Sequence, residues 1–180
     1  EAISAAVAAA LEAGKKAPAW VVGSTGLGDG QRERLTRLAK ATPVLVSSNF
    51  SMGVLALDHA IRSVASVLTR LGYQASLIER HHQHKKDAPS GTALLLEAGL
   101  KASGVPPRQT LSVRAGEVIG EHEVAFYGPA DEIRFTHRAQ DRTVFARGAL
   151  EAALWLVEQK SGPTYSMSDY FKSRIGGGAS

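Results

Sequence analysis

Residues 79–93 read ERHHQHKKDAPSGTA, and this stretch decides the interpretation of the fold. It joins a predicted strand at residues 73–80 to a predicted helix at residues 92–103. The first backbone N–H groups of a helix have no partner within the helix, and they carry partial positive charge. Ser90, Gly91 and Thr92 are therefore predicted to bind a carboxylate or a phosphate.

Proton donors accompany this predicted anion site. His81, His82 and His84 precede Lys85 and Lys86 in the same loop. Imidazole is the side chain most easily tuned to exchange a proton near neutral pH. The pattern predicts protonation of a bound anion, with His81 at the strand end as the strongest candidate.

A metal site made by these histidines is not favoured. Adjacent strand residues point to opposite faces, so His82 and His84 can pair while His81 diverges, and no cysteine is available to complete a tetrahedral zinc site. We expect no metal. His59 and His122 are interpreted as structural histidines without a chemical role.

The first 48 residues, which precede this stretch in the chain, are typical of half a doubly wound α/β sheet. The expected elements are a helix carrying Ile3, Val7 and Leu11, strands at residues 19–22 and 44–46, and a helix at residues 31–40. A second strand-to-helix turn, Gly23-Ser24-Thr25-Gly26, is either a contact for a phosphate or nicotinamide group or simply a tight turn.

A second domain is predicted from Asn49 onward. It opens with an amphipathic helix at residues 52–71, capped by Gly72, and continues through the stretch described above. The remaining expected elements are strands at residues 109–115, 122–127 and 132–139, a helix at residues 143–160 packed through Phe145, Ala149, Ala153 and Leu156 or Val157, and a loose tail from Gly176 to Ser180.

The predicted fold class is α/β (α+β). A partial Rossmann-like parallel sheet is joined to a second domain with an open mixed sheet and covering helices. The expected ranges are 1–48 for the remnant of a dinucleotide-binding domain, 49–150 for a substrate-binding and oligomerisation domain, and 151–180 for a C-terminal helix and tail that return to the first domain.

Composition excludes several classes of function. The 180 residues include no cysteine, which rules out disulfides and thiolate chemistry. No run of 18 uninterrupted apolar residues predicts a membrane span, and no signal peptide is indicated, so a cytoplasmic protein is expected. The net charge of +4 is scattered along a chain with only 6% aromatic residues, so nucleic-acid binding is not expected.

The stretch resembles the signature of the dihydrodipicolinate reductase family, in which Glu-x-His-His runs into Lys-x-Asp-x-Pro-Ser-Gly-Thr-Ala. The stretches VVGSTGLGDGQ, VLVSSNFSMGV and SVRAGEVIGEHEVAFYGPADEIRFTHRAQDRTVFARGALEAALWL agree in the same order. The resemblance covers residues 1 to about 169. It implies a homotetramer of lysine and diaminopimelate biosynthesis, in which NADPH or NADH reduces a cyclic imine dicarboxylate.

The resemblance also implies roles for individual residues. His81 would donate the proton, Lys85 would assist it, and His82, Ser90, Gly91 and Thr92 would bind the dicarboxylate. Lys86, Arg114 and Arg142 are further candidates for charge balance. The nicotinamide end of the cofactor would meet two turns, made of Gly23, Ser24 and Thr25 and of Ser47, Ser48, Asn49 and Phe50.

One departure from the family pattern concerns the cofactor. Family members begin with a Gly-rich strand, loop and helix that hold the dinucleotide diphosphate, and the 180 residues contain none. A first residue other than methionine favours a shortened chain, which we expect to bind the dinucleotide weakly. The alternatives are a dicarboxylate-binding or assembly protein derived from the reductase fold, and a lyase or cyclase that uses the same pocket without hydride transfer.

Overall fold

The computed structural model describes residues 17–24 and 26–176 of the chain. The chain packs as two compact units, Glu1–Phe50 with Phe145–Ser180, and Ser51–Val144. The domain ranges expected from the sequence stay a prediction, because they also assign binding roles that packing does not test. The expected helix around Ile3, Val7 and Leu11, the residue Thr25 and residues 177–180 lie outside the described part.

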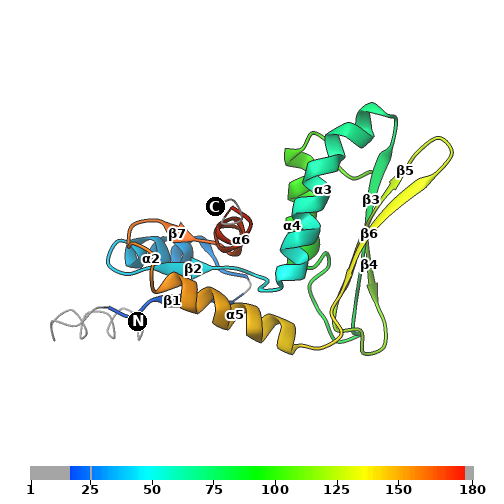
Figure 1. The fold of residues 1–180 in the computed structure, drawn as a ribbon. Helices are drawn as coiled ribbons and strands as arrows, with labels where there is room; N and C mark the ends of the chain where they lie inside the picture. Colours follow the sequence, from blue (N-terminus) through cyan, green and yellow to red (C-terminus); the bar gives the residue numbers. More distant parts are fainter. Residues whose placement is uncertain (1–16, 25, 177–180) are drawn as a thin grey trace. The chain divides into compact units, whose positions relative to one another are not determined.

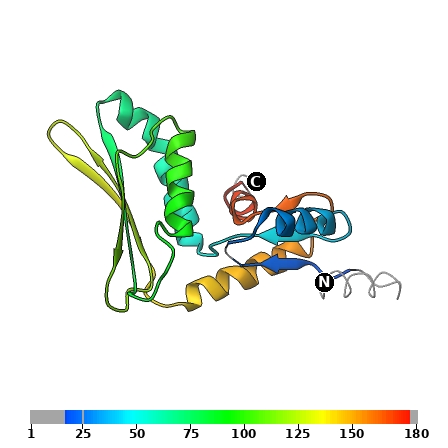
Figure 2. The same ribbon diagram turned by 180° about the vertical axis from the view of Figure 1, so that it is seen from behind.

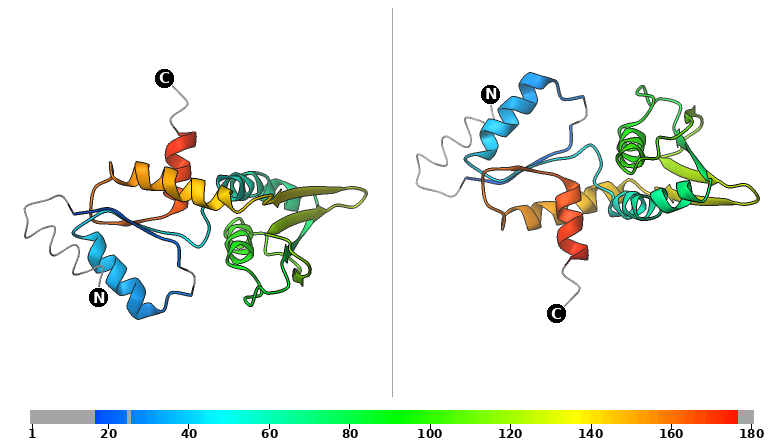
Figure 3. Two further views of the ribbon diagram at one scale, coloured as in Figure 1. Left: turned by 90° about the horizontal axis from the view of Figure 1, so that it is seen from below. Right: turned by 90° about the horizontal axis from the view of Figure 1, so that it is seen from above.

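The first unit is built on a parallel sheet in the order β1-β2-β7 (Figure 1). β1 is Trp20–Val22, β2 is Val44–Val46 and β7 is Thr164–Tyr165, with Trp20 aligned to Val44 and Val44 to Thr164. The helices are α2 (Asp29–Ala39), α5 (Thr143–Leu156, which begins just before this unit) and α6 (Met167–Ile175). Figure 3 shows α2 on one side of the sheet and α5 and α6 on the other. Val44 and Leu45 are fully buried, as expected of a strand covered on both faces.

The second unit is a four-stranded mixed sheet covered on one face by two helices (Figure 2). The strand order is β4-β3-β5-β6, where β3 and β4 are parallel and the other pairs antiparallel. The strands are β3 (Gln74–His81), β4 (Thr110–Arg114), β5 (Glu121–Tyr127) and β6 (Glu132–Arg138), and the helices are α3 (Met52–Arg70) and α4 (Gly91–Ala102). This arrangement confirms the predicted fold class.

The core of the second unit lies between these helices and the sheet. It is made of buried apolar side chains: Leu57, Ile61, Leu68, Leu77, Leu96, Leu100, Val124 and Phe126. In β3 every second residue is buried, so Ala75, Leu77, Glu79 and His81 all face the helices. The alternation that builds the core therefore also carries two ionisable side chains inward.

By length and composition alone α3 could cross a membrane, since its mean hydropathy reaches 1.2 over 18 residues. Its apolar side, which includes Val54, Leu57, Ile61 and Leu68, is instead buried within the unit. Gly72 follows the helix with φ of +89°, the conformation that ends helices and that glycine adopts most easily. α3 therefore contributes its apolar side to the core of the second unit.

The C-terminal part differs from the prediction. The helix expected at residues 143–160 ends at Leu156. The Val157 N–H still bonds the Ala153 carbonyl, but the N–H groups of Glu158 and Gln159 bond carbonyls three residues back and tighten the chain into a turn. Its packed side centres on Gly148, Ala152 and Leu156, whereas Val157 is exposed. Phe145, Ala149 and Ala153 flank that side and are half-buried. The short strand β7 and the helix α6 were not predicted.

Candidate functional site

The residues of the 79–93 stretch lie at the carboxyl end of β3 and the start of α4. β3 ends at His81, and α4 begins at Gly91 with Ser90 as its N-cap. The Ser90 hydroxyl accepts the Ala93 N–H at 3.2 Å, which fixes the first turn of the helix. The peptide bond between Ala88 and Pro89 is cis. The strand end and the helix N-terminus are thus brought together as predicted.

A buried carboxylate organises the site. Glu79 has no exposed surface, and its oxygens accept hydrogen bonds from Arg114 at 2.8 and 2.6 Å and from the Ser90 N–H at 3.2 Å. His81 Nδ1 also bonds this carboxylate. Burial by itself would raise the pKa of Glu79, but the hydrogen bonds from Arg114, Ser112 and His81 outweigh it and lower the pKa to about 2. Glu79 is therefore ionised at neutral pH.

His81 is the buried histidine that the sequence singled out. Only 7% of it is exposed, and burial lowers its pKa below the ordinary value, with Glu79 opposing that shift and Lys85 and Arg114 adding to it. Since Nδ1 is bound to Glu79, Nε2 is the nitrogen that can meet a ligand. A side chain at Gly120 would place its Cβ 3.1 Å from Nε2, so a glycine at this position leaves room for the ring.

His122 lies beside His81, and its interpretation as a structural histidine without a chemical role stays a prediction. The two rings meet edge to face with centroids 5.1 Å apart, and His122 Nε2 lies 3.0 Å from the Ser90 hydroxyl. Burial lowers the pKa of His122 to about 3, and its Nδ1 is buried without a hydrogen-bond partner, as befits a neutral ring. His122 thus connects His81 to the cap of α4.

The predicted binding residues lie in the loop after β3 and at the start of α4. Lys85 is half-buried and its Nζ lies 2.7 Å from an Asp87 oxygen, while the rings of His82 and His84 face each other with centroids 6.2 Å apart. Gly91 and Thr92 occupy the first two positions of α4. Contact of these residues with a substrate stays a prediction, as it does for Ser90, whose N–H and hydroxyl are used within the protein.

The three candidates for charge balance differ in position. Both terminal nitrogens of Arg114 bond protein groups, namely Glu79 and the carbonyls of Val113 and Asp87, so this arginine ties β4 to the loop before α4. Lys86 and Arg142 have exposed side chains. Across residues 17–24 and 26–176, no group of three or more His, Asp or Glu side chains is arranged to hold a metal ion.

The predicted cofactor residues lie after two adjacent parallel strands of the first unit. Gly23 and Ser24 follow β1, and Ser47 follows β2. The Ser47 hydroxyl donates to the Asn49 carbonyl at 2.6 Å and accepts the Asn49 N–H at 3.2 Å, which folds residues 47–49 into a tight turn, with Ser48 exposed at its tip. The carboxyl ends of neighbouring parallel strands are where open α/β sheets bind ligands.

Phe50 packs between two glycines of this unit. A Cβ at Gly23 would lie 3.1 Å from the Phe50 ring, and a Cβ at Gly148 would overlap the Phe50 carbonyl oxygen. Both glycines therefore permit close approach to the segment that follows β2. Contact of Gly23, Ser24, Ser47, Ser48, Asn49 or Phe50 with a nicotinamide stays a prediction.

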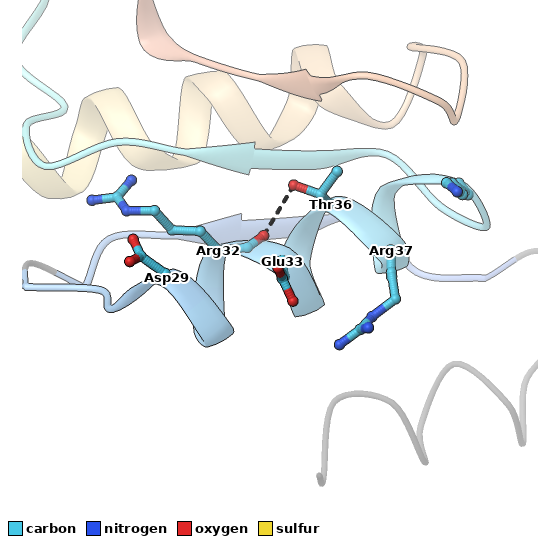
Figure 4. A pocket seen from close by; sticks show the side chains of 6 residues that line it. Asp29, Arg32, Glu33, Thr36 and Arg37 are labelled. Atoms are coloured by element: carbon cyan, nitrogen blue, oxygen red, sulfur yellow. Dashed lines mark hydrogen bonds between the residues drawn. The ribbon is translucent and has the colours of Figure 1, made fainter.

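A separate hollow of 530 Å³ runs along α2 (Figure 4). Its lining consists of side chains from one helix: Asp29, Arg32, Glu33, Thr36, Arg37 and Lys40. These charges are of both signs, and Thr36 bonds the Arg32 carbonyl of its own helix at 3.0 Å. The hollow includes no predicted site residue.

Comparison with known proteins identifies the family. The model of the family described as "Dihydrodipicolinate reductase, C-terminus" matches residues 53–171. The chain belongs to the dihydrodipicolinate reductase family. It is 38% identical over 171 residues to a 4-hydroxy-tetrahydrodipicolinate reductase of Archaeoglobus fulgidus, covering 84% of the chain and 66% of that protein. It is 44% identical over 149 residues to the enzyme of the same name from Xanthomonas campestris pv. campestris, covering 83% and 61%.

A solved member of the family has the same fold. The structure of a dipicolinate-bound dihydrodipicolinate reductase from Paenisporosarcina sp. TG-14 matches with a TM-score of 0.67 and 21% identity, covering 93% of the chain and 69% of that protein. The chain spans between 61% and 66% of the length of the two curated reductases. The region shared with the family model contains Glu79, His81, Arg114 and His122.

Proposed function

We propose that the chain carries the substrate site of a reductase that converts a dihydrodipicolinate-type cyclic imine dicarboxylate to tetrahydrodipicolinate in lysine and diaminopimelate biosynthesis. The observation that supports this most directly is the buried His81, which is linked through Glu79 and His122 to Ser90, the N-cap of α4, in a chain of this family. An acid linked to the N-cap of a helix suits a substrate that is both an anion and a proton acceptor.

In this proposal the substrate carboxylates bind at two kinds of donor. The N–H groups of Gly91 and Thr92, with the Thr92 hydroxyl, bind one carboxylate at the start of α4. Lys85 exchanges its exposed partner Asp87 for the other carboxylate, and His82 binds the substrate from the loop. Lys86 and Arg142 are exposed and add positive charge to the surroundings.

His81 would supply the proton, assisted by Lys85. Burial favours the neutral ring in the unliganded protein, because it lowers the pKa of His81. A bound dicarboxylate brings negative charge close to the ring and raises that pKa, so substrate binding itself prepares the acid. The proton then passes from Nε2 to the ring atom that becomes electron-rich on reduction.

NADPH or NADH is the reductant implied by the family, and it supplies the hydride when bound. The described residues suit its nicotinamide end. Adjacent parallel strands are followed by Gly23 and Ser24 in one case and by the tight turn at residues 47–49 in the other, and such strand ends are where open α/β sheets bind ligands. We propose weak dinucleotide binding by this polypeptide alone, measurable by calorimetry, because the residues that suit the cofactor are those predicted to meet its nicotinamide end.

We also propose that the protein is a cytoplasmic homotetramer. Leu111, Val113 and Tyr127, all on β4 or β5 of the second unit, are each at least 41% exposed, and apolar side chains of this kind suit a sheet face covered by another copy. A light-scattering mass of several times 19.0 kDa is expected at micromolar protein. A monomer mass would contradict this part of the proposal.

The reductase proposal is tested by substrate-dependent consumption of NADPH at saturating cofactor, comparing the parent chain, His81→Gln and the control His84→Gln. His84 is an exposed histidine of the same loop, so its replacement should leave turnover unchanged. Loss of turnover in His81→Gln alone supports the proposal. Binding of pyridine-2,6-dicarboxylate without any reduction would favour a dicarboxylate-binding protein, and substrate conversion without NADPH consumption would favour a lyase or cyclase.

A further inference from the structure

The hydrogen bonds of Glu79 determine which nitrogen of His81 carries a proton. An ionised carboxylate can only accept hydrogen bonds. Glu79 accepts from both terminal nitrogens of Arg114 and from the Ser90 N–H, and it also bonds His81 Nδ1. The hydrogen in that last contact must therefore be on His81 Nδ1. The neutral ring consequently has its lone pair on Nε2.

This arrangement defines where an exchangeable proton resides. When the ring gains a second proton, that proton is added to Nε2, the nitrogen that faces away from Glu79. When the ring loses it, Nδ1 keeps its hydrogen and its bond. A neutral imidazole without a fixed partner would populate two tautomers, one with its hydrogen on Nδ1 and one with its hydrogen on Nε2. Only the Nδ1–H tautomer leaves Nε2 free to accept the exchangeable proton.

Other contacts hold the ring against rotation. His122 meets the ring edge to face at 5.1 Å between centroids, and Gly120 leaves just enough space beside Nε2. The charged and titratable groups around the ring are Glu79 on its own strand, Arg114 on β4, His122 on β5 and Lys85 in the loop. Among them Glu79 alone is hydrogen-bonded to Nδ1.

Glu79 is itself held in one place. It has no exposed surface, so it cannot touch a substrate. Arg114 binds it through two parallel hydrogen bonds and also bonds the Asp87 carbonyl at 2.6 Å, which links the carboxylate to the loop that leads into α4. Burying a carboxylate costs several kcal/mol of desolvation free energy, on the order of magnitude known for buried ions, unless hydrogen-bonded partners offset it. Arg114 is the charged partner that offsets this cost for Glu79.

We propose that Glu79 is a positioning residue that fixes the tautomer and orientation of His81, so that Nε2 is the proton donor, and that Arg114 keeps Glu79 in place. The catalytic consequence rests on the proposed function, in which His81 is the acid. The tautomer itself does not, because it is a property of the unliganded chain.

The tautomer can be measured directly. Long-range ¹H–¹⁵N NMR of the histidine-labelled full chain distinguishes a protonated from an unprotonated ring nitrogen, and the signals of His81 are assigned by their loss in His81→Gln. At a pH where the ring is neutral, we expect His81 to carry its hydrogen on Nδ1. In Glu79→Gln, whose amide can donate as well as accept, we expect the two tautomers to mix. An Nε2–H ring in the parent chain, or an unchanged spectrum in Glu79→Gln, would overturn the proposal.

Glu123→Gln is the matched control. Glu123 also pairs with an arginine, Arg134 at 2.7 Å, and it lies one residue from His122 on β5, so its side chain points to the opposite face of the sheet. The control makes the same change of charge without touching His81, and its His81 spectrum should match the parent. If Glu79→Gln does not fold, Arg114→Lys replaces the two-pronged contact by a single ammonium, so that Glu79 stays ionised but is held less firmly. A minor population of the Nε2–H tautomer should then appear beside the Nδ1–H form.

Kinetics provide the second readout. In an active form of the enzyme, Glu79→Gln should lower kcat on the order of a hundredfold or more while leaving KM for the dicarboxylate nearly unchanged, because Glu79 acts on His81 and not on the substrate. A rise in KM with kcat unchanged would refute the positioning role. If no form of the enzyme reduces the substrate, the proposed function fails, and the NMR result still decides the tautomer.

Discussion

Replacing Gly148 by alanine should destabilise the first unit, although the same change usually stabilises a helix. Gly148 lies within α5, where alanine is favoured over glycine by roughly 1 kcal/mol. An added Cβ would, however, overlap the Phe50 carbonyl oxygen and lie 3.0 Å from the Phe50 carbonyl carbon. Backbone atoms cannot rotate away as a flexible side chain can, so α5 or the segment after β2 must shift.

The expected magnitude follows from these two opposing effects. Overpacking of a well-packed site costs typically 1–3 kcal/mol and occasionally more, and a clash with backbone belongs to the upper end of that range. Subtracting the gain from helix propensity leaves a net loss of about 2 kcal/mol. For a chain of this size, that loss corresponds to a melting temperature lower by roughly 4–8 °C.

Gly30→Ala is the matched control, since Gly30 is also a helical glycine of the first unit and an added Cβ there would meet nothing within 4 Å. It should raise the free energy of unfolding by a few tenths to about 1 kcal/mol. Both variants are compared with the parent by urea denaturation and by thermal melting. Gly148→Ala that is as stable as the parent or more stable would refute the close packing of α5 on Phe50.

Three further outcomes are expected. Stability should fall as the pH is lowered, because the folded-state pKa of His122, about 3, lies below its unfolded value near 6.5, and that of Glu79, about 2, lies below 4.5. The free energy of unfolding should decline from about pH 6.5 downward, and His122→Gln should reduce the upper part of the decline, to which His81 also contributes. A flat profile between pH 7 and 3 would contradict both assignments. Binding of pyridine-2,6-dicarboxylate near neutral pH should take up protons, measured by calorimetry in buffers of different ionisation enthalpy, and His81→Gln should abolish the uptake; equal uptake in that variant would assign the protons elsewhere. The same ligand should raise the melting temperature of the parent chain but not of the double variant Thr92→Val with Lys85→Ala, and equal protection of both would place the anion site elsewhere.

Local patterns in the sequence were sufficient for most of the elements. The strands β2 and β6 and the helices α3 and α4 were predicted to within a residue at each end, because periodic apolar positions and a closing glycine define them. β7 could not be found this way, since two residues become a strand only through their pairing with β2. α6 does have a local signal in the sequence, the capping box formed by Ser166 and Asp169.

The site shows the same division between local and non-local information. His81 and the start of α4 were recognised because they are close together in the sequence. Glu79 lies beside Arg114 because of the register between β3 and β4, and it lies opposite His122 because of the register between β3 and β5. Alternation of buried and exposed residues within one strand does not reveal its register with another. Glu79 and His81 lie on the same face of β3, yet Arg114 and His122 lie more than 30 positions further along the chain.

The distance between these partners has a consequence for a chain emerging from the ribosome. β3 is synthesised well before Arg114 and His122, and the two strands that carry them flank β3 on either side. Until both have been made and paired, Glu79 is a carboxylate without its arginine, and the imidazole two residues later has no fixed partner. The proton-donating group therefore matures only when the sheet around it closes, so a nascent or partly unfolded chain would bear the whole signature and still lack its chemistry.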